Sequence, residues 1–239
     1  MTEPLFHTDA YLQEFDAILT SVIEETRVVI LDKTAFYPGG GGQPCDLGSL
    51  LVNDILYPVE KVKKQGDDIL HFLGGDSPLP APNYASHGTL DWVRRYKLMR
   101  THTALHVLCG TIFRDYGAQV TGGNMEPLKG RLDFEFETMK GELVREIEAA
   151  INREVAEARD VRVNILPREE AFQIPDLIRT KINLLPEGIQ QVRTVEIVGL
   201  DLQADGGTHV RNTKEVGRIR IADYKSKGAI NKRIYIEVE

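Results

Sequence analysis

Four side chains that can bind a metal ion occur in two short motifs, far apart in the sequence. His102 and His106 stand in "THTALH", and Asp205 and His209 stand with the same spacing in "DGGTH". On a helix, residues at this spacing face the same way, with Cβ atoms about 5–6 Å apart, so two imidazoles can reach one ion. Imidazole nitrogens and carboxylate oxygens are both common ligands of zinc. The two motifs therefore predict a Zn²⁺ site formed by His102, His106, Asp205 and His209.

The predicted ligand set is typical of a catalytic zinc. Two rigid histidines with one or two loop ligands make a catalytic zinc arrangement with a position for water, and no fourth cysteine or histidine closes the site as a structural zinc would require. Zinc can lower the pKa of its water from 15.7 to about 7, polarise a carbonyl, or hold the substrate. The sequence does not choose among these three roles of the ion. The candidate nucleophile is a zinc-bound water, and no protein residue is assigned as general base. In the alternative interpretation, Asp205 caps a turn and His209 is an ordinary hydrogen-bonded residue.

Other hydrolytic mechanisms fit the sequence less well. Thr103 follows the first histidine, at the position where H-E-x-x-H metalloproteases carry a glutamate base. The chain has no Ser-His-Asp arrangement with a nucleophile-elbow sequence. Cys45 and Cys109 lack the spacing of a disulfide framework or zinc knuckle, and we expect both to be buried thiols. A covalent mechanism is therefore disfavoured.

A helix must present the first two histidines, and residues 92–117 have the pattern of one. No proline occurs before Gly117, and glycine is a common residue just past a helix end. The apolar residues of this segment fall approximately on one helical face: Val93, Leu98, Leu105, Leu108 and Ile112. The second motif contains a glycine pair, which suits a tight turn or a close backbone approach.

The remaining pattern predicts an α+β fold in two domains. Strands and helices interleave without a regular βαβ repeat. The expected strands are 26–32, 49–52, 54–64, 68–73, 161–167, 191–199, 215–224 and 232–239, and further helices are expected at 139–160 and 168–173. The segment 74–88 holds three prolines and three glycines and is interpreted as a connection. We place the domains at residues 1–90 and 91–239.

Length and composition exclude several classes of protein. The chain has 239 residues and a net charge of −7, which argues against a protein that coats DNA or other nucleic acid by bulk electrostatics. No apolar run approaches the roughly 18 residues of a membrane span. The N-terminal residues lack the basic start and apolar stretch of a signal peptide, so a cytoplasmic location is expected. The oligomeric state is not indicated.

Three motifs together resemble a known family. "FYPGGGGQPCDLG", "RTHTALHVL" and "ADGGTHVRNTKEVG" occur in the order found in the editing domain of alanyl-tRNA synthetase. In its length the chain resembles the medium-length form of the AlaX trans-editing proteins. The resemblance runs from about Val28 to the C-terminal "KGAINKRIYIEV" and so covers nearly the whole chain.

The resemblance implies a fold and an activity. The implied fold is an N-terminal β-barrel-like glycine-rich domain followed by an α+β alanyl/threonyl-tRNA synthetase-type editing core. The implied activity is zinc-dependent, ATP-independent deacylation of mischarged tRNA(Ala), chiefly Ser-tRNA(Ala), with Gly-tRNA(Ala) as a second candidate. The family's metal motifs map onto His102, His106 and His209, and its cysteine position falls on Asp205. Either Asp205 ligates zinc through oxygen, or three histidines and water complete the shell.

The resemblance also implies substrate-binding residues. An editing site should hydrogen-bond the serine hydroxyl, because rejection of an analogue that lacks such a group reaches about 10⁴–10⁵ in comparable cases. Thr34 matches the family's threonine upstream of the glycine-rich motif, and the shaped loop beside it comprises Gly39, Gly40, Gly41, Gly42 and Gln43. Candidate tRNA contacts are the basic residues near the motifs and at the C-terminus: Arg94, Arg95, Arg211, Lys225, Lys227, Lys232 and Arg233.

Two alternative functions stay open on the sequence. The first is a zinc hydrolase of a small ester or amide, which keeps the metal site without tRNA. The second is a non-catalytic tRNA-binding module whose metal site has decayed at Asp205.

Overall fold

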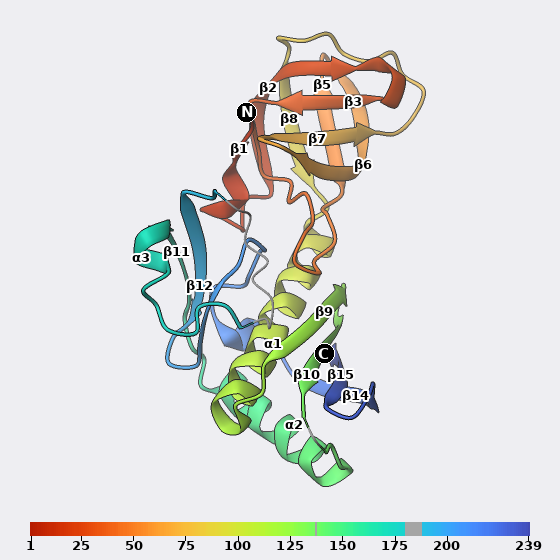
Figure 1. Ribbon diagram of the computed structural model, residues 1–239. Helices are drawn as coiled ribbons and strands as arrows, with labels where there is room; N and C mark the ends of the chain where they lie inside the picture. Colours follow the sequence, from red (N-terminus) through yellow and green to blue (C-terminus); the bar gives the residue numbers. More distant parts are fainter. Residues whose placement is uncertain (137, 180–187) are drawn as a thin grey trace. The chain divides into compact units, whose positions relative to one another are not determined.

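The computed structural model describes residues 1–136, 138–179 and 188–239. The chain divides into two compact units, Met1–Tyr96 and Lys97–Glu239 (Figure 1). Among the described residues, no helix is long and apolar enough to cross a bilayer.

The first unit is a closed β-barrel. Its strands, in order around the barrel, are β2 (Glu14–Ile23), β3 (Val28–Leu31), β7 (Asp68–Leu73), β6 (Ile55–Gln65), β5 (Gly48–Val52) and β8 (Ala85–Leu90). Along β2, Phe15, Ala17 and Leu19 are buried and alternate with exposed residues, which is the period of a strand with one face in a core. The expectation of a barrel-like N-terminal domain is confirmed.

Short elements complete the first unit. The two-residue strands β1 (Glu3–Pro4) and β4 (Lys33–Thr34) pair in parallel. Two 3-10 turns, η1 (Leu5–His7) and η2 (Glu24–Thr26), flank β2.

The predicted connection 74–88 is wrong over its last four residues, because they belong to β8. This strand pairs with both β2 and β5 and so closes the barrel. "ASHG" lacks the apolar alternation of a strand, but the residues at its inward positions are small for a physical reason. Ser86 donates to the carbonyl of Ala17, and a Cβ at Gly88 would lie 2.4 Å from the ring of Phe15. The bulk of Phe15 takes the place that a larger side chain on β8 would need.

In the part of the chain that the structure describes, the second unit contains two sheets and most of the longest helix. The helix α1 (Trp92–Tyr116) begins in the first unit and continues into the second. One sheet has the order β14 (Ile219–Ser226), β15 (Asn231–Val238), β10 (Lys129–Glu135) and β9 (Val120–Glu126). The other has the order β11 (Val161–Pro167), β12 (Gln191–Ile197) and β13 (Asp201–Ala204). The smaller elements are α2 (Gly141–Ala156), α3 (Arg168–Ala171) and η3 (Thr213–Val216).

The α+β class is therefore confirmed, but α1 differs from the expected amphipathic helix. Leu98, Leu105, Leu108 and Ile112 are buried as predicted, whereas Val93 in the first turn is 63% exposed. Between Thr101 and Ile112 every residue of the helix is buried. A helix buried on all sides has no single apolar stripe, and its polar residues must then find partners inside the protein.

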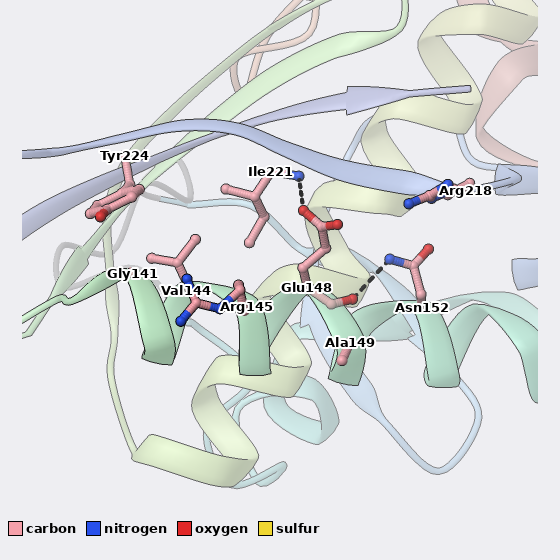
Figure 2. A pocket seen from close by; sticks show the side chains of 9 residues that line it. All are labelled: Gly141, Val144, Arg145, Glu148, Ala149, Asn152, Arg218, Ile221 and Tyr224. Atoms are coloured by element: carbon pink, nitrogen blue, oxygen red, sulfur yellow. Dashed lines mark hydrogen bonds between the residues drawn. The ribbon is translucent and has the colours of Figure 1, made fainter.

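Helix α2 packs against β14, the edge strand of its sheet (Figure 2). Glu148 accepts a hydrogen bond from the backbone N–H of Ile221 at 2.7 Å. Asn152 accepts from the N–H of Ile219 at 3.0 Å and donates to its carbonyl at 2.7 Å. These side chains satisfy backbone groups that an edge strand leaves unpaired. A groove of about 580 Å³ lies beside them, lined also by Arg145, Arg218 and Tyr224.

Candidate metal centre

The four predicted metal ligands lie together in the second unit. His102, His106, Asp205 and His209 each offer a ligand atom, and these atoms all lie within 4.8 Å of one another. The three imidazoles are buried, and the Asp205 side chain is 14% exposed. The ring centroid of His209 lies 4.2 Å from that of His102 and 4.6 Å from that of His106. The structure thus brings the two distant motifs to one point.

The loop that carries Asp205 and His209 is held by its own hydrogen bonds. β13 ends at Ala204, and the carboxylate of Asp205 accepts from the N–H of Gly207 at 2.7 Å, which is an Asx turn. The carbonyl of Asp205 accepts from Nη1 of Arg193 at 2.8 Å, and its N–H donates to the Arg193 carbonyl at 3.1 Å. Asp205 Oδ2 lies 3.0 Å from His209 Nε2, and Asp205 Oδ1 lies 3.6 Å from His102 Nε2.

Burial and mutual charge set the protonation of the cluster. Burial, against the opposing effect of Asp205 and with smaller contributions from His106 and Arg193, lowers the pKa of His102 to about 4. Burial also lowers the pKa of His209 well below its ordinary value. Burial by itself raises the pKa of Asp205, but the three imidazoles outweigh it and hold this pKa well below its usual range. Two neutral imidazoles beside an ionised carboxylate are in the protonation state that a cation requires.

His106 differs from the other two histidines. Burial lowers its pKa, but its contact with Asp201 and the charge of Asp205 outweigh burial, so the pKa is raised overall. Its Nδ1 is buried and, among the described residues, has no partner of good hydrogen-bond geometry.

The donor set fits zinc. Three imidazoles and one carboxylate supply nitrogen and oxygen donors of the kinds that Zn²⁺ accepts. The neighbouring thiol of Cys109 is not part of the cluster: it is buried, burial raises its pKa, and it accepts a hydrogen bond from Gln203 Nε2 at 3.3 Å. Cys109 is therefore the buried thiol expected from the sequence, whereas Cys45 is only partly buried.

Comparison of the sequence with known proteins shows which family it matches. Residues 192–235 match the family described as "Threonyl and Alanyl tRNA synthetase second additional domain", and residues 9–91 match "tRNA synthetases class II (A)". The alanyl-tRNA editing protein AlaX-M of Saccharolobus solfataricus is 40% identical over 244 residues, which cover 100% of both chains. AlaX-M of Methanosarcina acetivorans is 38% identical over 98% of both chains.

The chain belongs to the AlaX-M family of alanyl-tRNA editing proteins. The alanine–tRNA ligase of Ignicoccus hospitalis is also similar, with 41% identity over 92% of this chain but only 24% of the ligase. The family resemblance predicted from the three motifs is therefore confirmed.

The predicted AlaX-type substrate residues lie in the first unit. Thr34 is fully buried, its Oγ1 lies 2.9 Å from Nε2 of His71, and it accepts from the N–H of Phe36 at 3.1 Å. The four glycines of the run all have positive φ, from 56° to 137°. Gly40 and Gln43 close the loop by exchanging backbone hydrogen bonds of 2.9 and 3.0 Å. The run is therefore a shaped turn, and only glycine adopts these φ values without strain at every position.

One predicted tRNA contact needs correction. The Arg95 side chain is 0% exposed, its guanidinium is paired with the carboxylate of Asp46, and it also donates to the carbonyls of Ala10 and Ala35. A fully buried and paired guanidinium cannot reach a phosphate. "RRYK" resembles a basic patch because sequence alone does not distinguish a buried arginine from an exposed one.

The other predicted basic residues differ in their surroundings. Arg211, Lys225 and Lys227 are exposed, and Lys225 pairs with Asp223 at 3.0 Å. Lys232 is buried and donates to the carbonyls of Gly228 and Ala229, while Arg233 binds Asp133 through two hydrogen bonds of 2.6 and 2.7 Å. Arg94 is partly buried and donates to the carbonyl of Cys45.

Sequence reasoning missed the residues that hold the ligands in place. Thr103 stands at the position that excludes a protease class, and the sequence does not indicate that its Oγ1 lies 3.1 Å from His209 Nδ1. Arg193, which holds the Asp205 backbone, belongs to none of the sequence motifs. Neither residue has a local sequence signal, because each acts on a residue that is close only after folding.

Proposed function

We propose that this chain is a zinc-dependent trans-editing hydrolase that deacylates mischarged tRNA(Ala), chiefly Ser-tRNA(Ala), in the cytoplasm. Membership of the AlaX-M family makes it an aminoacyl-tRNA deacylase. The observation that carries the zinc dependence is the convergence of three imidazoles and one carboxylate at a buried point.

The four residues of the cluster would hold the ion, with Asp205 in the position where the family usually offers a thiolate. Zn²⁺ at this position would supply a Lewis acid for hydrolysis of the aminoacyl ester. Asp205 is favoured over a shell of three histidines because its two carboxylate oxygens face His102 and His209, and because it is ionised. The burial of the three histidines excludes bulk water from the ligands and strengthens the attraction of the ionised Asp205 carboxylate for a cation.

Serine recognition is proposed for Thr34 and the glycine loop. With Nδ1 of His71 donating to the carbonyl of Val29, the Thr34 hydroxyl donates to Nε2 and accepts from Phe36. A hydroxyl oxygen has two lone pairs, so Thr34 keeps one acceptor site, which a substrate hydroxyl would reach by displacing the side chains that bury it. Thr34→Val should remove discrimination between Ser-tRNA(Ala) and Ala-tRNA(Ala). Unchanged discrimination in a folded Thr34→Val protein would limit Thr34 to a role in packing.

Binding of tRNA(Ala) is proposed for the exposed basic residues Arg211, Lys225 and Lys227, with Arg94 as a further candidate. Binding of this kind weakens as salt is raised, and the log–log slope of affinity against salt changes by about one unit for each phosphate that is neutralised.

The deciding experiment measures release of amino acid from Ser-tRNA(Ala), Gly-tRNA(Ala) and Ala-tRNA(Ala) by the purified protein, together with its zinc content. We expect rapid release of serine, little release of alanine, about one zinc per chain, and loss of both activity and zinc in His102→Ala. Equal hydrolysis of all three tRNAs would overturn the specificity. Equal rates on a free seryl ester would favour the small-ester hydrolase instead, and a metal-free, inactive protein would favour the binding module.

A further inference from the structure

A second carboxylate, outside the four candidate metal ligands, lies close to one of them. Asp201, the first residue of β13, has a fully buried side chain, and its Oδ2 lies 3.3 Å from Nδ1 of His106. Asp201 is not among the residues that converge on the metal position. Any effect of Asp201 on metal binding must therefore be indirect, either through its contact with His106 or through the stability of the fold.

The carboxylate of Asp201 is itself held in place. Gln203 donates from Nε2 to Asp201 Oδ2 at 2.6 Å, and Arg179 donates from Nε to Oδ1 at 3.4 Å. The Arg179 guanidinium lies over the ring of Phe113, 3.9 Å from its centroid. These interactions orient Oδ2 toward the helix that carries His106.

A glycine in the middle of α1 admits this carboxylate. Gly110 stands one turn after His106, and a Cβ there would lie 2.7 Å from the Cβ of Asp201 and 3.2 Å from the carbonyl oxygen of Leu200. Glycine is unfavourable inside a helix, so its presence in a 25-residue helix requires a reason. The reason here is the close approach of the segment that begins β13.

We propose that Asp201 is a positioning residue for the metal centre, and that Gly110 provides the space in which it acts. With Nδ1 of His106 facing a carboxylate, Nε2 is the ring nitrogen left for an ion. A carboxylate that binds the second ring nitrogen of a ligating histidine fixes the tautomer and orientation of that ring. It also makes the imidazole a stronger metal ligand. Asp201 does for His106 what Thr103 does for His209. The inference rests on the proposed zinc site.

The test measures zinc affinity of the full chain by competition with a chromophoric chelator, independently of activity. Asp201→Asn keeps the size of the side chain and removes its charge, and we expect a roughly 10–100-fold loss of affinity. Gly110→Ala should give a loss of the same order with Asp201 intact, because the added methyl displaces the carboxylate. Asp133→Asn is the matched control: it also removes the charge of a buried carboxylate paired with arginine, and should leave zinc affinity unchanged.

A double-mutant cycle separates positioning from a general effect on the fold. In the His106→Ala background, Asp201→Asn should cause no further loss of affinity, because the histidine through which it acts is gone. An equal loss in both backgrounds, or wild-type affinity in Asp201→Asn, would overturn the inference. If His106→Ala weakens zinc binding and Asp201→Asn does not, only the positioning role fails. If the wild-type chain binds no zinc, the inference and the proposed zinc dependence fail together.

Should Asp201→Asn fail to fold, thermal unfolding and circular dichroism will reveal it, and Gly110→Ala then carries the test. A folded Gly110→Ala protein with wild-type zinc affinity would also contradict the proposal.

Discussion

Thr103 Oγ1 lies 3.1 Å from Nδ1 of His209, and the same oxygen accepts the backbone N–H of Val210 at 3.2 Å. A threonine next to His102, a candidate metal ligand on α1, therefore holds another histidine on the loop. Because Nδ1 of His209 faces Thr103, its Nε2 faces Asp205 and the candidate metal position. The helix and the loop are aligned by a residue that is not a ligand itself.

Thr103→Val should weaken zinc binding about tenfold or more, because it removes the polar partner of His209 Nδ1. Chelator competition on the purified protein measures the change. Thr111→Val is a suitable control, since Thr111 is buried on the same helix and its Oγ1 has no partner among the described residues. Thr111→Val should keep full zinc affinity and leave stability unchanged or raised. Equal losses in both variants would show that Thr103 acts through packing.

Substitutions of Asp205 should distinguish the two ligand sets. Asp205→Cys restores the thiolate of the family pattern and should retain zinc, whereas Asp205→Ala should lose most of it. In Asp205→Ala the carboxylate that faces two histidines is also missing. Metal analysis after gel filtration measures zinc per chain. Full zinc and full activity in Asp205→Ala would mean that three histidines suffice.

His71 should make the stability of the barrel depend on pH. Burial lowers the pKa of His71 from 6.5 to about 4, so between these values the unfolded chain binds a proton that the folded chain excludes. Stability from this group is therefore fully present above pH 6.5 and is lost as the pH falls toward 4, by up to about 3 kcal/mol.

Calorimetric unfolding from below the folded pKa of His71 to neutral pH measures this dependence. His71→Gln is the control, because a Gln side chain can still accept from Thr34 but does not titrate. The free energy of unfolding of the wild-type protein should fall more steeply with decreasing pH than that of the variant. Parallel curves would contradict the assignment.

Arg95→Met should destabilise the first unit by about 3–5 kcal/mol, because it leaves the buried Asp46 carboxylate without its guanidinium. Denaturant unfolding measures this loss. Lys227→Ala, at an exposed site, should leave stability nearly unchanged and instead reduce the salt dependence of tRNA binding. If Arg95→Met were stable and reduced the salt dependence of tRNA binding, Arg95 would be a tRNA contact after all.

The features that the sequence predicted well depend on short-range patterns. The spacing of His102 and His106 predicts a shared helical face from the geometry of one turn. The order of the three motifs along the chain identified the family. The β-rich first domain followed from its alternating strands, although β8 was missed because its inward positions are a serine and a glycine.

The arrangement around the ligands was decided by the tertiary structure. Arg95 and Lys227 look alike in sequence, but only the fold shows that one is buried against Asp46 and the other is exposed. Asp201 gave no signal, because its contact with His106 joins residues that meet only after β13 packs on α1. Local spacing determined which side chains could bind a metal. Which residues hold and orient those ligands depends on contacts between distant segments, and a single sequence does not encode them in any local pattern.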